Sequence, residues 1–189
     1  MIRFSKFLVL ASLFLVSCSS DNGNGDPEKE SFDRQAMLVN WADNNIIPAL
    51  ENFKTSTQNL EEKTTAFATA PTEEGLEELR SAFRQAYLDF QTVSVFETGP
   101  AEMLNFRSFL NTYPTGTEAI NSSISSGSYN LELPSTYAQQ GFPALDYLIN
   151  GLAATDTEIV ETYTSEAYRN YLTEVAERIN FLTGQVLEQ

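Results

Sequence analysis

Apolar residues recur every three or four positions over most of the chain, which is the spacing that places them on one face of an α-helix. The first such stripe runs from Asp33 to about Ala68. Its members are Leu38, Trp41, Ile46, Leu50, Phe53, Leu60 and Phe67, with Thr57 and Thr64 in the same register. Because Pro48 removes one backbone hydrogen bond inside this stripe, we expect the helix to kink or restart near Asn44 and Asn45.

A second stripe begins at Thr72, whose hydroxyl can cap a helix, and the acids Glu73 and Glu74 suit the positive end of that helix. The inward positions that follow are Leu76, Leu79, Phe83, Tyr87 or Ala86, Phe90, Val93 and Glu97. We expect the helix to continue to Gly99–Pro100, which ends it. Glu97 then takes an inward position in the last turn.

A third stripe follows Ser165, a suitable first residue for the last helix. Its members are Tyr168, Leu172, Val175, Ile179, Leu182 and Val186. No run alternates polar and apolar residues for long enough to predict a strand. The pattern therefore predicts an all-α fold, an up-down helical bundle of three long helices plus shorter ones.

The segment between the second and third long helices contains shorter helical patterns. We expect short helices over Ala101–Leu110, Pro134–Gln140 and Glu158–Tyr163. Residues 111–133 are rich in Ser, Thr, Asn and Gly, and we expect them to form one long loop. A loop of that length inside a compact domain is usually functional or mobile.

The stretch Gly141–Asn150 opens with Gly and Pro and continues apolar with one carboxylate, Asp146. Gly141 permits a close backbone approach, and Pro143 suits the first turn of a helix. Asp146 is then about one turn inside that helix. Its carboxylate either faces solvent or is held inward for a purpose.

The N-terminal residues have the pattern of a lipoprotein signal. Residues 1–17 join a charged start to an apolar run that is too short for a permanent membrane span. The run ends at Cys18, the single cysteine of the chain, in the form of a lipobox. We expect cleavage before Cys18, lipidation of its thiol, a flexible polar tether over residues 18–30 and a helical domain over residues 31–189. The expected location is the cell envelope, at the outer membrane of a Gram-negative bacterium.

Charge and histidine content exclude several functions. The formal net charge is −15, and no basic patch offsets it, so nucleic acid is not an expected partner. The chain has no histidine, which excludes a His-based zinc site and a Ser-His-Asp triad within it.

Three segments together resemble the imelysin family, which includes the iron-regulated protein A lipoproteins. They are Asn40–Pro48, Val95–Ala101 and Gly141–Leu148. The last aligns with the Gly-x-His-x-x-Glu signature of the family, where this chain has Gly141, Pro143 and Asp146. The resemblance implies an all-helical fold of which this chain is the N-terminal half.

The resemblance implies a lipid-anchored envelope protein that binds a ligand or metal in iron uptake. Asp146 with Glu97 or Glu102 could hold a hard divalent cation, since Ca²⁺ and Mg²⁺ take oxygen ligands. Without the histidine of the signature we do not expect a metallopeptidase. The alternative is a structural module that binds an envelope protein or a second copy of itself and has no small-molecule site.

Overall fold

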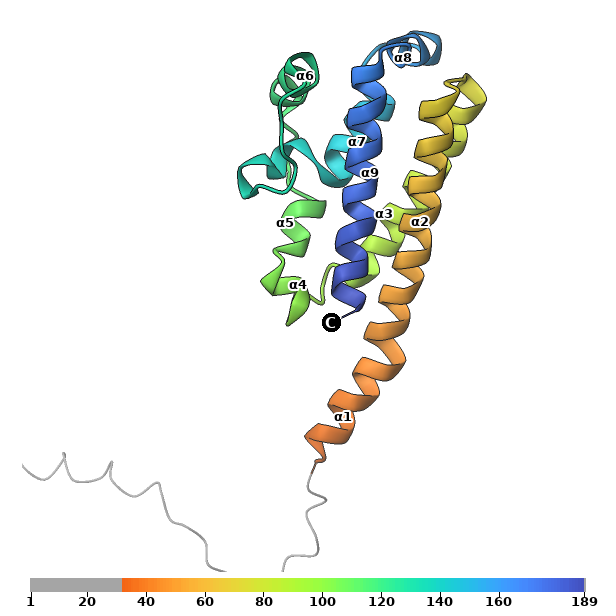
Figure 1. Ribbon diagram of the computed structural model, residues 1–189. Coiled ribbons are helices and arrows are strands. Elements are labelled where there is room, and N and C mark those ends of the chain that lie inside the picture. The colour runs from red at the N-terminus through yellow and green to blue at the C-terminus, as the bar shows by residue number, and fades with distance from the viewer. Residues whose placement is uncertain (1–31, 189) are drawn as a thin grey trace, which may run out of the picture. The chain divides into compact units, whose positions relative to one another are not determined.

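The computed structural model describes residues 32–188, and every regular element among them is a helix (Figure 1). The elements are α1 (Arg34–Trp41), a π-helical turn η1 (Ala42–Ile46), α2 (Ile47–Thr69), α3 (Glu73–Val93), α4 (Pro100–Met103), α5 (Phe106–Leu110), α6 (Thr117–Ser126), a 3₁₀-helix η2 (Pro134–Gln139), α7 (Gly141–Asn150), α8 (Asp156–Thr162) and α9 (Glu166–Leu187). The expected signal peptide, Cys18 and tether lie outside the described residues. The all-α fold class is confirmed, and none of the described helices is long and apolar enough to cross a membrane.

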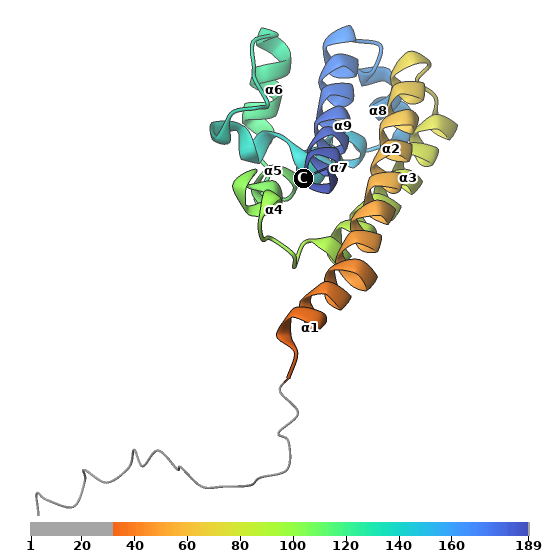
Figure 2. The ribbon, with the colours of Figure 1, turned by 60° about the horizontal axis from the view of Figure 1, so that its bottom comes forward.

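The three long helices α2, α3 and α9 form the bundle that the sequence predicts. Helix α2 packs against both others and runs opposite to each (Figures 1 and 2). The three stripes meet in one core, whose long-helix members include Phe53, Leu60, Phe67, Leu76, Leu79, Phe83, Phe90, Val93, Leu172, Val175, Ile179, Leu182 and Val186. Helix α7 lies against α3 and α9 and adds Phe142, Leu145, Leu148 and Ile149 to this core.

The start of the first long helix is only partly as expected. The break expected near Asn44 and Asn45 is confirmed, because both lie in the π-helical turn η1 that separates α1 from α2, and Pro48 lies in the first turn of α2. The burial expected for Leu38 and Trp41 is wrong, since no residue of α1 is buried and these two side chains are 56% and 49% exposed. The reason is that α1 extends past the ends of α3 and α9 (Figure 1).

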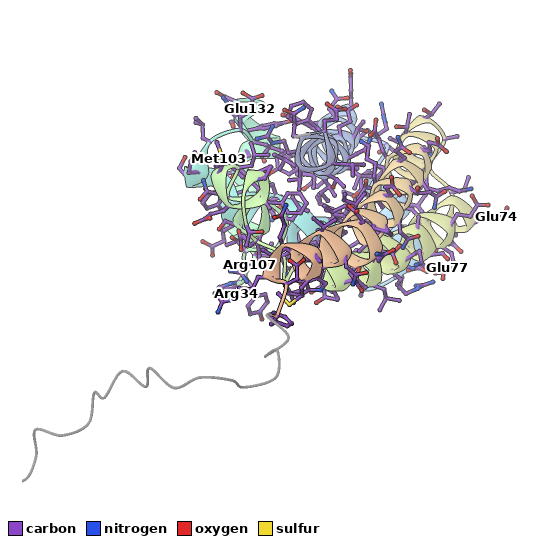
Figure 3. All side chains as sticks on the ribbon, turned by 90° about the horizontal axis from the view of Figure 1, so that it is seen from below. Arg34, Glu74, Glu77, Met103, Arg107 and Glu132 are labelled. Atoms are coloured by element: carbon purple, nitrogen blue, oxygen red, sulfur yellow. The ribbon has the colours of Figure 1, made fainter. Side chains whose placement is uncertain are left out.

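Helix α3 starts where expected and ends early. The Thr72 hydroxyl accepts a hydrogen bond from the Gly75 amide at 3.0 Å, and Glu74 and Glu77 of the first two turns point outward (Figure 3). The helix ends at Val93 rather than at Gly99–Pro100, which instead begins α4. Residues 92–95 are Thr, Val, Ser and Val, which have low helix propensity. Glu97 therefore lies in a connecting segment and not in a helix.

The segment expected to be a loop contains helix α6. Ile120 and Ile124, one helical turn apart, are both buried, and α6 packs against α9 and α7. Gly127 ends the helix with a φ of 63°, as a C-terminal glycine does. The other positions are mostly Ser and Asn, which have low helix propensity, so the sequence does not predict this helix. Its stability comes from the burial of the two isoleucines.

The shorter helices depart from expectation in their bounds. Ala101–Leu110 is two helices, α4 and α5, separated at Asn105, which has a φ of 51°. The helix expected from Glu158 starts two residues earlier, because Thr155 and Glu158 form a capping box around Asp156. The helix over Pro134–Gln139 is confirmed as a 3₁₀-helix.

Candidate functional site

Gly141 allows the N-terminus of α7 to touch the C-terminus of α5. Its φ is 75°, a conformation that favours glycine. A Cβ added there would lie 2.3 Å from the carbonyl oxygen of Leu110 and 2.5 Å from that of Phe109. No other residue fits this contact without a shift of the backbone. Gly141 therefore sets the position of every residue of α7 relative to α5.

Gln140 fixes the same helix start from the other side. Its side chain is buried, and Nε2 donates to the backbone oxygen of Leu131 at 2.6 Å and to the Thr136 hydroxyl at 3.1 Å. The Tyr171 hydroxyl of α9 donates to the backbone oxygen of Gln139 at 2.8 Å. The beginning of α7 is thus held by α5, by the segment before η2 and by α9.

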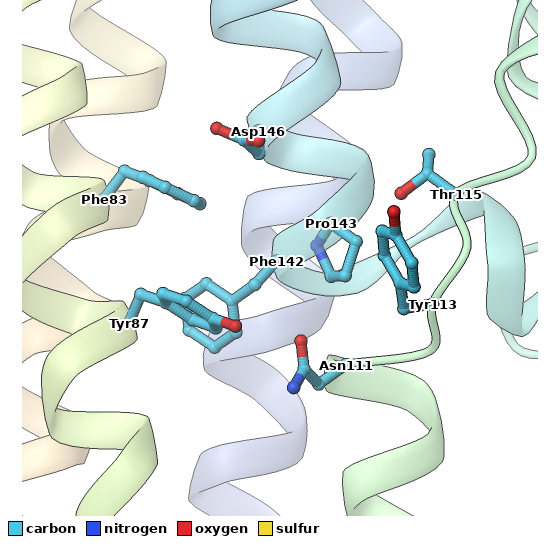
Figure 4. A pocket seen from close by; sticks show the side chains of 8 residues that line it. All are labelled: Phe83, Tyr87, Asn111, Tyr113, Thr115, Phe142, Pro143 and Asp146. Carbon is cyan, nitrogen blue, oxygen red and sulfur yellow. The ribbon is translucent and has the colours of Figure 1, made fainter.

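A pocket of about 370 Å³ opens beside the first turns of α7 (Figure 4). Pro143 and Asp146, the two changed positions of the family signature, both line it. The complete lining is Phe83 and Tyr87 of α3, Asn111, Tyr113 and Thr115 of the segment between α5 and α6, and Phe142, Pro143 and Asp146 of α7. The volume is in the range of small-molecule sites in proteins.

Aromatic side chains make up half of the residues that line the pocket. The ring of Phe142 is buried, with its centroid 5.2 Å from that of Tyr87 and 6.0 Å from that of Phe83. The Phe83 and Tyr87 rings stack with an interplanar angle of 12°. Tyr113 stands on the opposite side and is 85% exposed (Figure 4). The pocket therefore has a fixed aromatic floor and one exposed aromatic side.

Four polar side chains of the lining have no hydrogen-bond partner among residues 32–188. They are the hydroxyls of Tyr87, Tyr113 and Thr115 and the amide of Asn111. Asp146 is exposed, and its Oδ1 accepts one hydrogen bond from Asn150 Nδ2 at 2.8 Å. Within the described part of the chain no ion pair includes Asp146. A ligand would thus find one carboxylate without a counterion and several unused hydrogen-bonding groups.

The other two predicted metal ligands do not line this pocket. Glu97 lies between α3 and α4, where its Oε2 is 2.7 Å from Nε of Arg107 and its Oε1 accepts from the Arg107 amide. Glu102 is exposed on α4. No group of three His, Cys, Asp or Glu side chains within residues 32–188 is placed to hold a metal ion, so Glu97, Glu102 and Asp146 form no such group.

The sequence did not identify most of the pocket residues. The core stripe of α3 was expected to continue through Tyr87 or Ala86, and Ala86 is the buried one, while Tyr87 is 37% exposed. Asn111, Tyr113 and Thr115 fall in the segment whose length pointed to function, but nothing singled out these three positions. Only the packing of α7 between α3 and α5 brings them together.

The comparisons with known proteins agree on one family. The family model for imelysin, peptidase M75, matches residues 46–189. A crystal structure of a protein named as an iron-regulated protein A precursor, from Parabacteroides distasonis, has the same fold with a TM-score of 0.70 and 16% sequence identity. The match covers 88% of this chain and 46% of that one, so this chain spans about half the length of the solved protein. No curated protein matches. The family resemblance drawn from the three sequence segments is confirmed.

Proposed function

The chain belongs to the imelysin family, and from this premise we propose that it is a binding protein of the bacterial cell envelope with a role in iron acquisition. The observation that carries the proposal is the pocket beside α7. Its lining includes Pro143 and Asp146 at the signature positions, and Gly141 of the same signature holds the helix in place. The iron connection rests on the family and on the name of the solved protein, of which this chain spans 46%.

We propose binding rather than peptide hydrolysis as the role of this pocket. Hydrolysis by a metallopeptidase needs a metal-activated water and a general base. The chain has no histidine, and Asp146 is the single carboxylate of the pocket. The remaining lining is aromatic or neutral, which is suited to holding a ligand and lacks the paired acid and base of a hydrolase.

Location in the envelope is part of the proposal and rests on Cys18. Its position after a short apolar run supports lipidation and attachment to the outer membrane. Metabolic labelling of cells with an alkyne-tagged palmitate, followed by membrane fractionation, tests this. Label and membrane association should both be lost in Cys18→Ser. Equal recovery of that variant in the membrane fraction would refute the anchor.

Thermal shift measurements on the purified protein test the binding function. Ligands that bind only the folded state raise the midpoint of unfolding. The panel consists of Fe²⁺, Fe³⁺, Ca²⁺, Mg²⁺, haem and small organic amines. We expect at least one member of the panel to raise the unfolding midpoint of the wild type. The same ligand should not raise the midpoint of Asp146→Ala. It should still raise the midpoint of the control variant Glu161→Gln. Glu161 is an exposed acid on α8 outside the pocket, so its substitution removes the same charge elsewhere. Midpoints unchanged by the whole panel would contradict the proposal.

A second candidate function is association between copies of this chain through α1. Its exposed apolar side chains are Met37, Leu38, Val39 and Trp41, followed by Ile47 at the start of α2. Residues 35–47 contain one charged residue, Asp43, in a chain of net charge −15. Two copies can therefore associate through the exposed apolar face of α1 with little charge repulsion, although the protein as a whole is strongly acidic.

Sedimentation velocity tests the association. A dimer should form at micromolar concentrations and dissociate in Leu38→Lys. The control Leu133→Lys, at another exposed apolar side chain, should remain dimeric. A wild type that stays monomeric at every concentration would contradict this second function.

A further inference from the structure

The pocket beside α7 combines features that select among ligand classes. It has one carboxylate, Asp146, together with the aromatic rings of Phe83, Tyr87, Phe142 and Tyr113. We propose that it binds an organic cation, an ammonium or guanidinium group carried on an apolar stem. This inference rests on the proposed binding function and names the class of ligand for the same site.

The aromatic side chains are the first argument for an organic cation. The face of an aromatic ring attracts a cation that lies within about 6 Å of the ring centroid, and quaternary ammonium and guanidinium groups exploit this. Phe83 and Tyr87 stack on one side of the pocket, and Tyr113 stands on the other (Figure 4). A hydrated metal ion would gain little from these rings, whereas an alkylammonium group gains both charge and apolar contact.

The placement of the oxygen atoms is the second argument. A bare divalent cation needs several oxygen ligands that converge on one point. Asp146 and Tyr113 instead stand apart on different sides of Pro143 (Figure 4). No group of three acidic, His or Cys side chains within residues 32–188 is placed to bind a metal. Oxygens spread around a pocket of about 370 Å³ match the several N–H donors of an amine or guanidinium.

The unused hydrogen-bonding groups are the third argument. Asn111 and Thr115 offer side-chain oxygens that no other described residue uses. Asp146 keeps one oxygen, Oδ2, without a hydrogen bond inside the described chain. Because the protein carries a net charge of −15, its field also raises the local concentration of cations and repels anions. Charge, shape and hydrogen-bonding capacity thus favour the same ligand class.

Isothermal titration calorimetry of the purified protein with matched probes tests the inference. Choline and its neutral isostere 3,3-dimethyl-1-butanol have the same shape, but choline carries one positive charge and the isostere carries none. Choline should bind at least about tenfold more tightly, since the charge adds both a cation–π and a carboxylate contact. Choline has no N–H donor, so this pair tests the charge and the aromatic contacts, and the guanidinium probes test the hydrogen bonds. Agmatine and an acetylated Gly-Arg-Gly amide present the guanidinium as a free small molecule and as a protein side chain. Whichever of the two binds more tightly identifies the source of the group.

Variants separate charge from shape. Asp146→Asn should remove the preference for choline over the isostere, while the control Glu161→Gln should retain it. Tyr113→Leu should weaken choline several-fold more than it weakens the isostere, because it removes a π-face at an 85% exposed position. Circular dichroism of each variant confirms that it is folded.

The outcomes distinguish this inference from the proposed function. Equal affinity for choline and its isostere, or unchanged affinity in Asp146→Asn, would overturn the organic-cation assignment. Binding of iron or haem without any binding of the cations would overturn it as well and leave the binding function standing. Absence of binding by every probe would overturn both.

Discussion

The contact between Gly141 and α5 makes a sharp prediction about stability. In Gly141→Ala the new methyl group would stand 2.3 Å from the Leu110 carbonyl oxygen, at a φ of 75°. An L-residue in the left-handed region costs about 1–2 kcal/mol. A backbone oxygen cannot rotate away as a side chain can, so α7 must move from α5, and such overpacking costs about 1–3 kcal/mol.

The unfolded state offsets a small part of this cost. Alanine has less conformational freedom than glycine in the unfolded chain, which returns about 0.4–1 kcal/mol. The net loss is then about 1–4.6 kcal/mol. For a domain of this size each kcal/mol lowers the midpoint by about 2–4 °C, so the expected fall is roughly 2–18 °C.

Gly127→Ala is the control, because it places alanine at a positive φ without a steric clash. The difference between the two variants therefore measures the clash with α5 alone. The φ of Gly127 is 63°, and a Cβ added there would meet no atom within 4 Å. Gly127→Ala should therefore lose only about 0–1.6 kcal/mol, because the crowding cost is absent. Thermal and urea unfolding of both variants measure the difference. Equal losses in the two variants would refute the close approach of α7 to α5.

Three further predictions concern contacts of α7, α8 and α9. Asp156→Asn should lower the midpoint at neutral pH but not in strong acid. Hydrogen bonds from Arg80 hold the pKa of the Asp156 carboxyl below its ordinary value of 3.8, so its stabilisation is present above pH 3.8 and is lost as pH falls through the lowered pKa. Phe142→Ala should cost about 3–5 kcal/mol of unfolding free energy in urea titrations, because a fully buried ring is removed, and a cost under about 1 kcal/mol would contradict its place in the core. Glu177→Gln should raise the midpoint at pH 7, since partial desolvation and the neighbouring carboxylates of Glu61 and Glu174 raise the pKa of the exposed Glu177 above its ordinary value of 4.5. That gain should vanish below pH 4.5, where the wild-type side chain is protonated in both states, and a gain that is independent of pH would contradict it.

The long helices were predictable because each carries a continuous apolar stripe that tertiary packing then uses. Thr72 as a cap and Pro48 as a restart follow from local chemistry that does not depend on the rest of the fold. Helix α6 was missed because its buried side consists of Ile120 and Ile124 alone within a Ser-rich run. The exposure of α1 could not be foreseen, since an apolar stripe does not show whether another helix covers it.

The candidate site was only partly accessible from the sequence. Gly141, Pro143 and Asp146 are one contiguous motif, so a family resemblance points to all three. Tyr87 and Tyr113 come from separate segments, and no local pattern connects them with Asp146. Their proximity depends on how closely α7 packs against α5, which is decided by the missing Cβ of Gly141.

A two-dimensional ¹H–¹⁵N NMR titration of the purified protein with choline tests the central claim, that the pocket beside α7 is a ligand site, most directly. Amide shifts report where a ligand binds without depending on any substitution. Our account predicts saturable shifts concentrated at residues 83–87, 111–115 and 142–147, and saturation of the same shifts only at higher choline concentration in Asp146→Asn. Shifts concentrated elsewhere, or a wild-type spectrum unchanged by choline, iron and haem alike, would contradict it.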